Sequence, residues 1–193
     1  SGVATRLVVY KLTSAGKLDT SFATGGVYNQ GVLAAVTEAY SVALQGTALV
    51  TTGYGRDAAT ESLDWVSLRL TAAGALDPSY GTGGFARLDV GGFNDNSRQL
   101  LVLPDRRVML LGAGRPTETD SDAAIAVLTE SGGRDTSFGP KGLRLYDLGG
   151  TADSFWDAAL SPQQDRVAVV GVKSSGTAPG DDDAALLILP LGR

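Results

Sequence analysis

The chain of 193 residues contains no cysteine and no histidine. Without these side chains it cannot form zinc sites with thiolate or imidazole ligands, thiol nucleophiles, or hydrolase centres that use an imidazole base. A block of lysine and arginine is also missing, and 16 basic against 21 acidic residues give a net charge of −5. Such a charge repels nucleic acid and anionic lipid, so we expect neither as a partner.

Long apolar runs are absent as well, and no stretch resembles a membrane span or a signal peptide. We therefore expect no membrane insertion. The chain begins with Ser1 and not with methionine, which is compatible with an export signal that was removed or is not included. Because cysteine is missing, the composition carries no clue to the redox state of the compartment.

The chain is rich in apolar residues (43%) and in glycine (26 residues), which indicates a globular all-β fold with many turns between short strands. Three segments are near copies of one another: 18–26 (LDTSFATGG), 76–84 (LDPSYGTGG) and 134–142 (RDTSFGPKG). Their aspartates are 58 residues apart in both steps (77 minus 19, and 135 minus 77). A period of this size indicates one supersecondary unit that must stack on its neighbours to bury its apolar surface.

Segments of strand length follow the same period. Strands are expected at 7–12, 27–33, 39–45, 48–53, 65–70, 85–90, 97–103, 107–112, 123–128, 143–148, 156–161, 166–171 and 184–189. Turn residues such as Gly46-Thr47 join pairs of these strands into hairpins. The sequence therefore predicts a unit of four antiparallel strands, repeated in a single array over 1–193. The expected repeats are 1–35 (partial), 36–93, 94–151 and 152–193 (partial).

The expected strands carry apolar side chains on both faces. In the strand at 65–70, Val66, Leu68 and Leu70 point one way and Trp65 points the other way. A sheet with one wetted face would instead alternate between apolar and polar residues. Burial on both faces is typical of a blade held between neighbouring blades of a β-propeller.

The motif at 76–84, the hairpin at 100–112 and the strands that follow Asp64 and Asp122 together resemble the delta-60 repeat family of bacterial proteins. The resemblance covers nearly the whole chain. It departs from the family pattern at Ala23, where the motif prefers glycine, and at Pro140-Lys141, where it prefers Thr-Gly. The resemblance implies a propeller in an exported or surface-attached protein, and it implies no established activity.

By analogy with related propellers, each hairpin begins a blade and the strand after the motif ends it. The chain then starts with the last two strands of one blade and stops after the third strand of another, so it holds about three blades. Three blades are too few to close a ring with a packed interior. We therefore expect part of a larger ring, or a ring completed by an oligomer, with further blades of the same parent protein or another protein as the partner.

The repeated motif is interpreted as structural. Aspartate followed by Thr-Ser or Pro-Ser forms an Asx-turn that satisfies backbone amides, and the next aromatic residue fills the space between blades. The residues in these roles are Asp19, Phe22, Asp77, Tyr80, Asp135 and Phe138. The alternative is that the aspartates form a ring of ligands around a common site. The glycines of the motif are not expected to hold phosphate, because no helix is predicted to start after them.

Two loops before expected strands are acidic. One contains Glu118, Asp120 and Asp122, and the other contains Asp181, Asp182 and Asp183. Carboxylate oxygens suit a hard cation, and Ca²⁺ takes about six to eight oxygen ligands. Neither loop has the spacing of a known calcium loop, so a solvated acidic run is the alternative. No other cofactor is expected.

Asp153, Trp156 and Asp157 form the one place where acids and aromatic residues mix in a way that could hold a sugar. Paired carboxylates could also serve a glycosidase. The earlier repeats have Tyr40 and Arg98 at the position of Trp156. Packing of the indole between blades is the alternative interpretation.

These observations favour a non-catalytic extracellular or cell-surface propeller that acts as a structural, adhesive or interaction scaffold. The alternative is a lectin-like propeller that binds a glycan or another small ligand with loops on one face. A carboxylate- or metal-dependent hydrolase ranks third, because a fold implies no activity and the sequence shows no reactive constellation. No catalytic residue is predicted.

Overall fold

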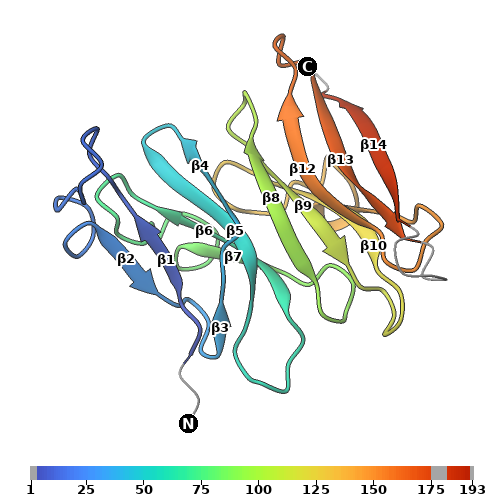
Figure 1. Ribbon diagram of the computed structural model, residues 1–193, viewed down its shortest axis with the longest axis horizontal. Helices are drawn as coiled ribbons and strands as arrows, with labels where there is room; N and C mark the ends of the chain where they lie inside the picture. Colours follow the sequence, from blue (N-terminus) through green and yellow to red (C-terminus); the bar gives the residue numbers. More distant parts are fainter. Residues whose placement is uncertain (1–3, 175–181, 192–193) are drawn as a thin grey trace.

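The computed structural model describes residues 4–174 and 182–191. In this part of the chain the fold is all-β, as predicted, and four antiparallel sheets follow one another in chain order (Figure 1). The helical content is one turn of 3₁₀ helix, η1 (Pro140–Gly142). The helical content of these ranges includes no segment with the length and apolar character of a membrane span.

The sheets contain two to five strands each. The first consists of β1 (Leu7–Tyr10) and β2 (Val27–Gln30). The second consists of β3 (Val36–Thr37), β4 (Ser41–Gln45), β5 (Ala48–Arg56), β6 (Asp64–Leu70) and β7 (Phe85–Leu88). The third consists of β8 (Asn96–Val102), β9 (Val108–Gly114), β10 (Asp122–Leu128) and β11 (Leu143–Tyr146). The fourth consists of β12 (Ser154–Leu160), β13 (Arg166–Ser174) and β14 (Asp182–Pro190).

The second and third sheets repeat one antiparallel pattern, β4–β5–β6–β7 and β8–β9–β10–β11, and the short β3 pairs with the far end of β5. Equivalent strands recur at the period found in the sequence, since β6 starts at Asp64 and β10 at Asp122. The first sheet contains the equivalents of the third and fourth strands, and the fourth sheet contains those of the first three. The two terminal sheets are therefore incomplete versions of the repeated unit.

The expected ends of three strands are wrong. The sequence predicts that strands end at Gly53, Gly112 and Gly171, but β5, β9 and β13 continue beyond these glycines. Each of these glycines lies inside a strand, where the backbone of the neighbouring segment leaves no space for a side chain. Opposite Gly112, the register of β8 shifts between Ser97 and Gln99, and the bulged strand approaches the glycine backbone closely.

Three apolar clusters hold the molecule together, and each lies between two consecutive sheets. Buried members are Phe22 and Leu68 between the first and second sheets, Trp65 and Leu110 between the second and third, and Ile125 and Phe155 between the third and fourth. On β6, Leu68 thus packs toward the first sheet and Trp65 toward the third. Burial on both faces, which the sequence predicts, is confirmed for β6 and β10 of the second and third sheets.

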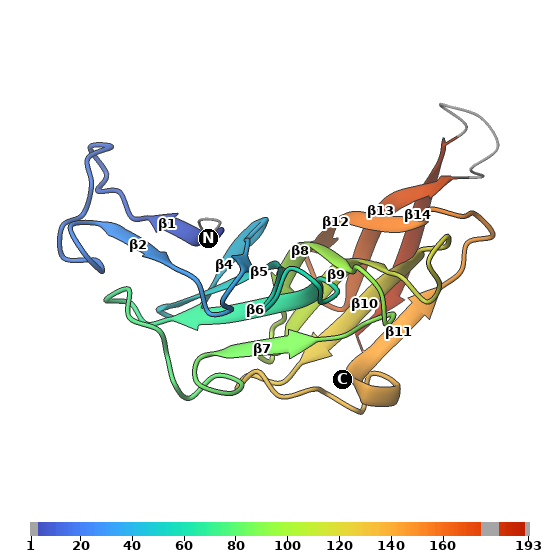
Figure 2. The ribbon, with the colours of Figure 1, turned by 90° about the horizontal axis from the view of Figure 1, so that it is seen from below.

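The sheets lie closest together along their first strands. Figure 2 shows β4, β8 and β12 along one side of the row and β7 and β11 along the other, and the contacts between neighbouring sheets concentrate on the first strands and β5. Equivalent side chains form a chain of hydrogen bonds here. Ser41 Oγ donates to Gln99 Oε1, and Gln99 Nε2 donates to Asp157 Oδ1 at 2.7 Å. The sheets therefore splay from a common inner edge.

Candidate functional site

In each copy of the repeated motif, the aspartate closes an Asx-turn with the serine two residues later. Asp77 Oδ1 accepts hydrogen bonds from the Ser79 backbone N–H at 3.0 Å and from the Ser79 hydroxyl at 2.7 Å. The same pair of bonds is present at Asp19 and Asp135. Each turn thus uses a carboxylate oxygen for its own backbone, as the structural interpretation of the motif requires.

A basic side chain holds the second oxygen of the Asp77 carboxylate. Arg69 Nε donates to Asp77 Oδ2 at 2.8 Å, and Arg69 is buried. Its guanidinium also donates to Gln45 Oε1 at 2.8 Å and lies 4.9 Å from the centre of the Tyr80 ring. Tyr80 is fully buried between the second and third sheets. The motif therefore joins a turn, an ion pair and an aromatic plug into one structural unit.

Replacing Asp77 by alanine is expected to lower the free energy of unfolding at pH 7 by about 1 to 3 kcal/mol, because buried Arg69 and the turn lose their acceptor. The hydroxyl of Ser79 and then Arg69 hold the pKa of Asp77 below its ordinary value. The carboxylate therefore stabilises the fold above the unfolded-state pKa of about 4, and this contribution is lost as the pH falls through the lower folded-state pKa. Urea denaturation at pH 7 and pH 3 measures the difference between the two proteins. A difference that does not shrink at acid pH contradicts this account.

The three residues predicted to bind a sugar lie in different environments. Asp153 is fully buried just before β12, whereas Trp156 is 58% exposed and Asp157 is exposed on β12. No described segment buries Trp156, so its packing between sheets stays a prediction. Sugar binding stays a prediction for Trp156 and Asp157, without Asp153 on the same surface.

The fourth sheet has an uncovered apolar face. Leu186 and Ile188 on β14 are 69% and 50% exposed, and Val170 on β13 is exposed beside them. The equivalent residues of the third sheet, 61 positions earlier, are Ile125 and Val127, which are 0% and 1% exposed. They are buried because the fourth sheet covers them. The exposed face of the fourth sheet therefore has the character of a surface between sheets.

The first sheet has a matching uncovered face. Val8 and Tyr10 on β1 are exposed, whereas their equivalents 58 positions later on β6, Val66 and Leu68, are buried. Leu68 is buried because the first sheet precedes and covers it. No described segment covers the first sheet in the same way.

β4 is uncovered on one side as well. Val42 and Leu44 are exposed, whereas their equivalents on β8, Leu100 and Val102, pack in the cluster between the second and third sheets. The strands that would cover β4 are the first two of a complete first sheet, and the described residues supply neither. The uncovered faces of the two terminal sheets and of β4 form the candidate interaction surface of the protein.

Two groups of carboxylates also recur at the repeat period. Each residue brings one oxygen to within 4.8 Å of the other two in the first acidic group, Asp64, Asp89 and Asp95, and in the second acidic group, Asp122, Asp147 and Asp153. In both groups the acids come from the start of the third strand, the residue after the fourth strand and the residue before the next sheet. Sequence reasoning did not bring these acids together. The signal that could have found them is the repeated pattern Asp-x-Gly-Gly-x-x-Asp at 89–95 and 147–153.

The third acid of each group caps a turn. Asp95 accepts hydrogen bonds from the backbone N–H groups of Val90 at 2.7 Å, Gly91 at 3.1 Å and Arg115 at 2.8 Å. Burial raises the pKa of Asp95 to about 6, although these bonds act in the opposite direction. In the first repeat Thr37 holds the same position, and its hydroxyl accepts the corresponding amide bonds. A hydroxyl is thus sufficient for the cap, so the cap alone does not explain why acids gather here.

The acidic residues of the two loops predicted to hold Ca²⁺ lie in different places in the structure. Asp122 belongs to the second acidic group, and Asp120 is close enough to raise its pKa. Glu118 instead lines a surface hollow with Arg115. In the other loop, Asp181 lies outside the described residues, and Asp182 and Asp183 are exposed at the start of β14.

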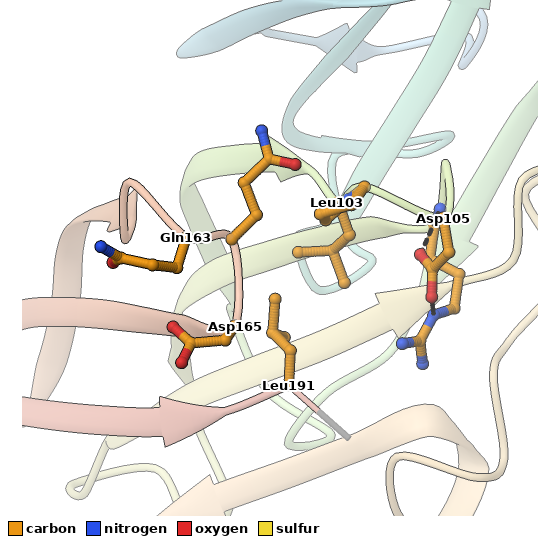
Figure 3. Close-up of a pocket in the computed structure, with 8 residues that line it drawn as sticks. Leu103, Asp105, Gln163, Asp165 and Leu191 are labelled. Carbon is orange, nitrogen blue, oxygen red and sulfur yellow. Dashed lines mark hydrogen bonds and ion pairs between the residues drawn. The ribbon is translucent and has the colours of Figure 1, made fainter. Parts of the chain in front are cut away.

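A small cleft lies between the turns of the hairpins β8–β9 and β12–β13. It measures about 280 Å³, and Leu103 and Leu191 stand between Asp105 on one side and Gln163 and Asp165 on the other (Figure 3). Both acids already pair with a neighbouring arginine. The cleft therefore has a mixed lining of apolar and polar side chains, and its two acids are already paired, so we assign no function to it.

No protein-family model and no curated protein matches this chain. The resemblance to the delta-60 repeat family therefore stays a prediction from the motif and its spacing.

Proposed function

We propose that the chain is a non-catalytic structural scaffold, a section of a β-propeller outside the cell or at its surface, whose terminal sheets bind further sheets of the same repeat. The uncovered apolar faces carry this proposal. Leu186 and Ile188 occupy positions that are buried where a following sheet is present. Val8 and Tyr10 occupy positions that are buried where a preceding sheet is present. A sheet of the same repeat has the shape and the apolar surface to cover both faces.

The arrangement of the sheets along their inner edge favours a propeller in which a further sheet stacks on the fourth sheet. Sheets that splay from a common edge are what the radial order of a propeller needs. Tyr40 on this edge is accompanied by Arg98 of the next sheet, whose guanidinium lies 5.4 Å from the ring centre. Trp156 holds the equivalent position in the fourth sheet and is exposed. This favours a following sheet, more than a sugar, as the group that covers Trp156.

Self-association tests the proposal, because the chain carries both terminal faces. Sedimentation velocity over a wide range of concentrations is expected to show a mass that increases with concentration. The fourth-sheet face of one copy would stack on the first-sheet face of the next, which is a heterologous contact. The double substitution Leu186→Glu and Ile188→Glu places two charges in this contact and should weaken association by about tenfold or more.

Phe93→Glu is the matched control for this experiment. Phe93 is exposed like Leu186, but it lies in the loop between β7 and β8 and not on a terminal sheet. This variant should associate as the original chain does. A chain that stays monomeric at every concentration, or a double variant that associates normally, contradicts the proposal.

A further inference from the structure

The second acidic group and the neighbouring Asp120 place four carboxyl groups around one loop junction. Asp122 starts β10, Asp147 follows β11, Asp153 precedes β12, and Asp120 lies two residues before Asp122. Burial first, and then the charges of Asp120, Asp147 and Asp153, raise the pKa of Asp122. No donor among the described residues forms a hydrogen bond with the Asp122 carboxylate. The group is therefore short of positive charge.

Two buried oxygens of this junction lack a hydrogen-bond donor among the described residues. One is Oδ1 of Asp153, a fully buried residue, and the other is Oδ1 of Asp120. In the preceding repeat, Asp95 uses the equivalent oxygen to accept the N–H of Arg115. A buried carboxylate oxygen without a donor is costly unless a cation or a water binds it. The free oxygen of Asp153 thus points independently to a ligand at this junction.

The first acidic group shows what fills this place when the chain supplies a cation. Arg87 on β7 donates from Nε to Asp64 Oδ2 at 2.6 Å, and it also pairs with Asp57 and Glu61. The equivalent residue on β11 is Leu145, which has the same place in the register of its sheet. An apolar side chain cannot neutralise the acids beside it. Among the described residues, the second acidic group therefore has no counterpart of the Arg87–Asp64 ion pair.

One basic residue lies near the second group. Lys173 Nζ lies 3.5 Å from the point that a Cβ on Gly149 would occupy, in the loop between Asp147 and Asp153. Lys173 nevertheless forms no ion pair with an acid in the described ranges. No ion pair among the described residues therefore balances the second acidic group, and a cation from solvent can fill this role.

We propose that the second acidic group, together with Asp120, binds Ca²⁺ through its carboxylates. Three of these residues offer oxygens within 4.8 Å of one another. Two oxygens that each lie about 2.4 Å from one Ca²⁺ are at most about 4.8 Å apart, so the spacing of these three oxygens meets the condition that one shared ion sets for each pair. The smaller Mg²⁺ binds at about 2.0 Å and demands a stricter octahedron, which irregular loops supply less readily. Asp147 is exposed and leaves a route from solvent.

The bound ion would strengthen the connection between the third and fourth sheets. The Asp153 N–H donates to the Ser121 carbonyl at 2.8 Å, and the Ser121 N–H donates to the Thr151 carbonyl at 3.2 Å. These bonds already tie the start of β10 to the segment before β12. Ca²⁺ at the same junction adds carboxylates from both segments, and binding only to the folded chain raises its stability.

Calorimetric titration of EDTA-treated protein with CaCl₂ tests the site, together with thermal unfolding followed by circular dichroism. We expect about one Ca²⁺ per chain. At a Ca²⁺ concentration 100-fold above Kd, the unfolding temperature should rise by roughly 5 to 10 °C. The Gly149 N–H donates to Asp147 Oδ1, and the amide oxygen of an Asp147→Asn variant can accept the same bond, so this variant should fold normally. It should weaken Ca²⁺ binding by about tenfold or more, because it removes one negative charge from the site.

Exchange of the two equivalent residues gives the sharper test. Leu145→Arg installs the cation of the first acidic group and should abolish both the binding heat and the thermal shift. Arg87→Leu removes that cation and should raise the stoichiometry to about two Ca²⁺ per chain. The double variant Asp182→Asn and Asp183→Asn is the control, because these exposed acids belong to the other acidic loop, and it should bind Ca²⁺ as the original chain does.

The proposal is overturned if the original chain shows neither binding heat nor a thermal shift with CaCl₂. It is also overturned if Asp147→Asn and Leu145→Arg, folded by circular dichroism, bind Ca²⁺ as tightly as the original chain. Loss of binding in the Asp182→Asn and Asp183→Asn variant would assign the ion to the other loop. None of these readouts depends on self-association, so they are independent of the proposed scaffold function.

Discussion

Trp65→Ala is expected to lower the free energy of unfolding by about 3 to 5 kcal/mol. Trp65 on β6 is fully buried in the cluster that joins the second and third sheets. Its indole N–H donates to the Ala113 carbonyl on β9 at 3.0 Å. The substitution therefore leaves a cavity between two sheets and removes a hydrogen bond that crosses from one to the other.

The sequence supplies a matched control, because its second tryptophan, Trp156, is largely exposed. Trp156→Ala should change the free energy of unfolding by no more than about 0.5 kcal/mol. Urea denaturation followed by circular dichroism compares both variants with the original chain at a concentration low enough to avoid association. If the two substitutions cost the same, Trp65 does not hold the sheets together as described.

Gly112→Ala is expected to cost about 3 kcal/mol, because the added methyl group has no space. A Cβ at Gly112 would overlap the carbonyl oxygen of Asn96 and lie 2.8 Å from the Cα of Ser97. These are backbone atoms of the bulge in β8, which cannot move without breaking the pairing with β9. Gly53 and Gly171 meet the same obstacle in the neighbouring sheets, so the corresponding substitutions should be similarly destabilising.

Gly133→Ala serves as the comparison for the glycine experiment. A Cβ there would meet only the Thr129 side-chain oxygen at 3.3 Å, and Gly133 lies on the surface. We expect a change within about 1 kcal/mol, since a surface glycine with an ordinary backbone conformation tolerates alanine. Equal denaturation midpoints for Gly112→Ala and Gly133→Ala would contradict this prediction, because they would show that β8 moves to make room for the methyl group at little cost.

Much of the fold follows from the period of 58 residues. Equivalent residues at this spacing identify the strands, because apolar runs and turn residues recur at matching places. The apolar residues on both faces of the strand at 65–70 predict sheets that are covered on both sides, and the clusters around Trp65 and Leu68 confirm it. The strand ends at Gly53, Gly112 and Gly171 were missed because a lone glycine indicates a turn and a close backbone approach equally well.

The sequence predicts much less about the candidate sites than about the fold. Asp122, Asp147 and Asp153 belong to three separate connections, and their separation along the chain says nothing about the distance between their oxygens until β10, β11 and β12 are in place. Trp156 was expected to be packed or to hold a sugar, but its exposure depends on whether a sheet follows it, which no local pattern reveals.

Local periodicity thus specifies which strands form and which side chains are equivalent, because strand pairing and turns depend on neighbouring residues. Packing between sheets determines which equivalent residues of the repeat are buried and which are exposed. Leu186 and Ile125 are the same residue position of the repeat, yet one is exposed and the other buried, because only the second has a sheet stacked on it. Arg87 and Leu145 occupy equivalent positions of the repeat, and only Arg87 forms an ion pair with an acid of its group. The sequence does not show this difference, because the acids come together only when three separate connections fold to the same point.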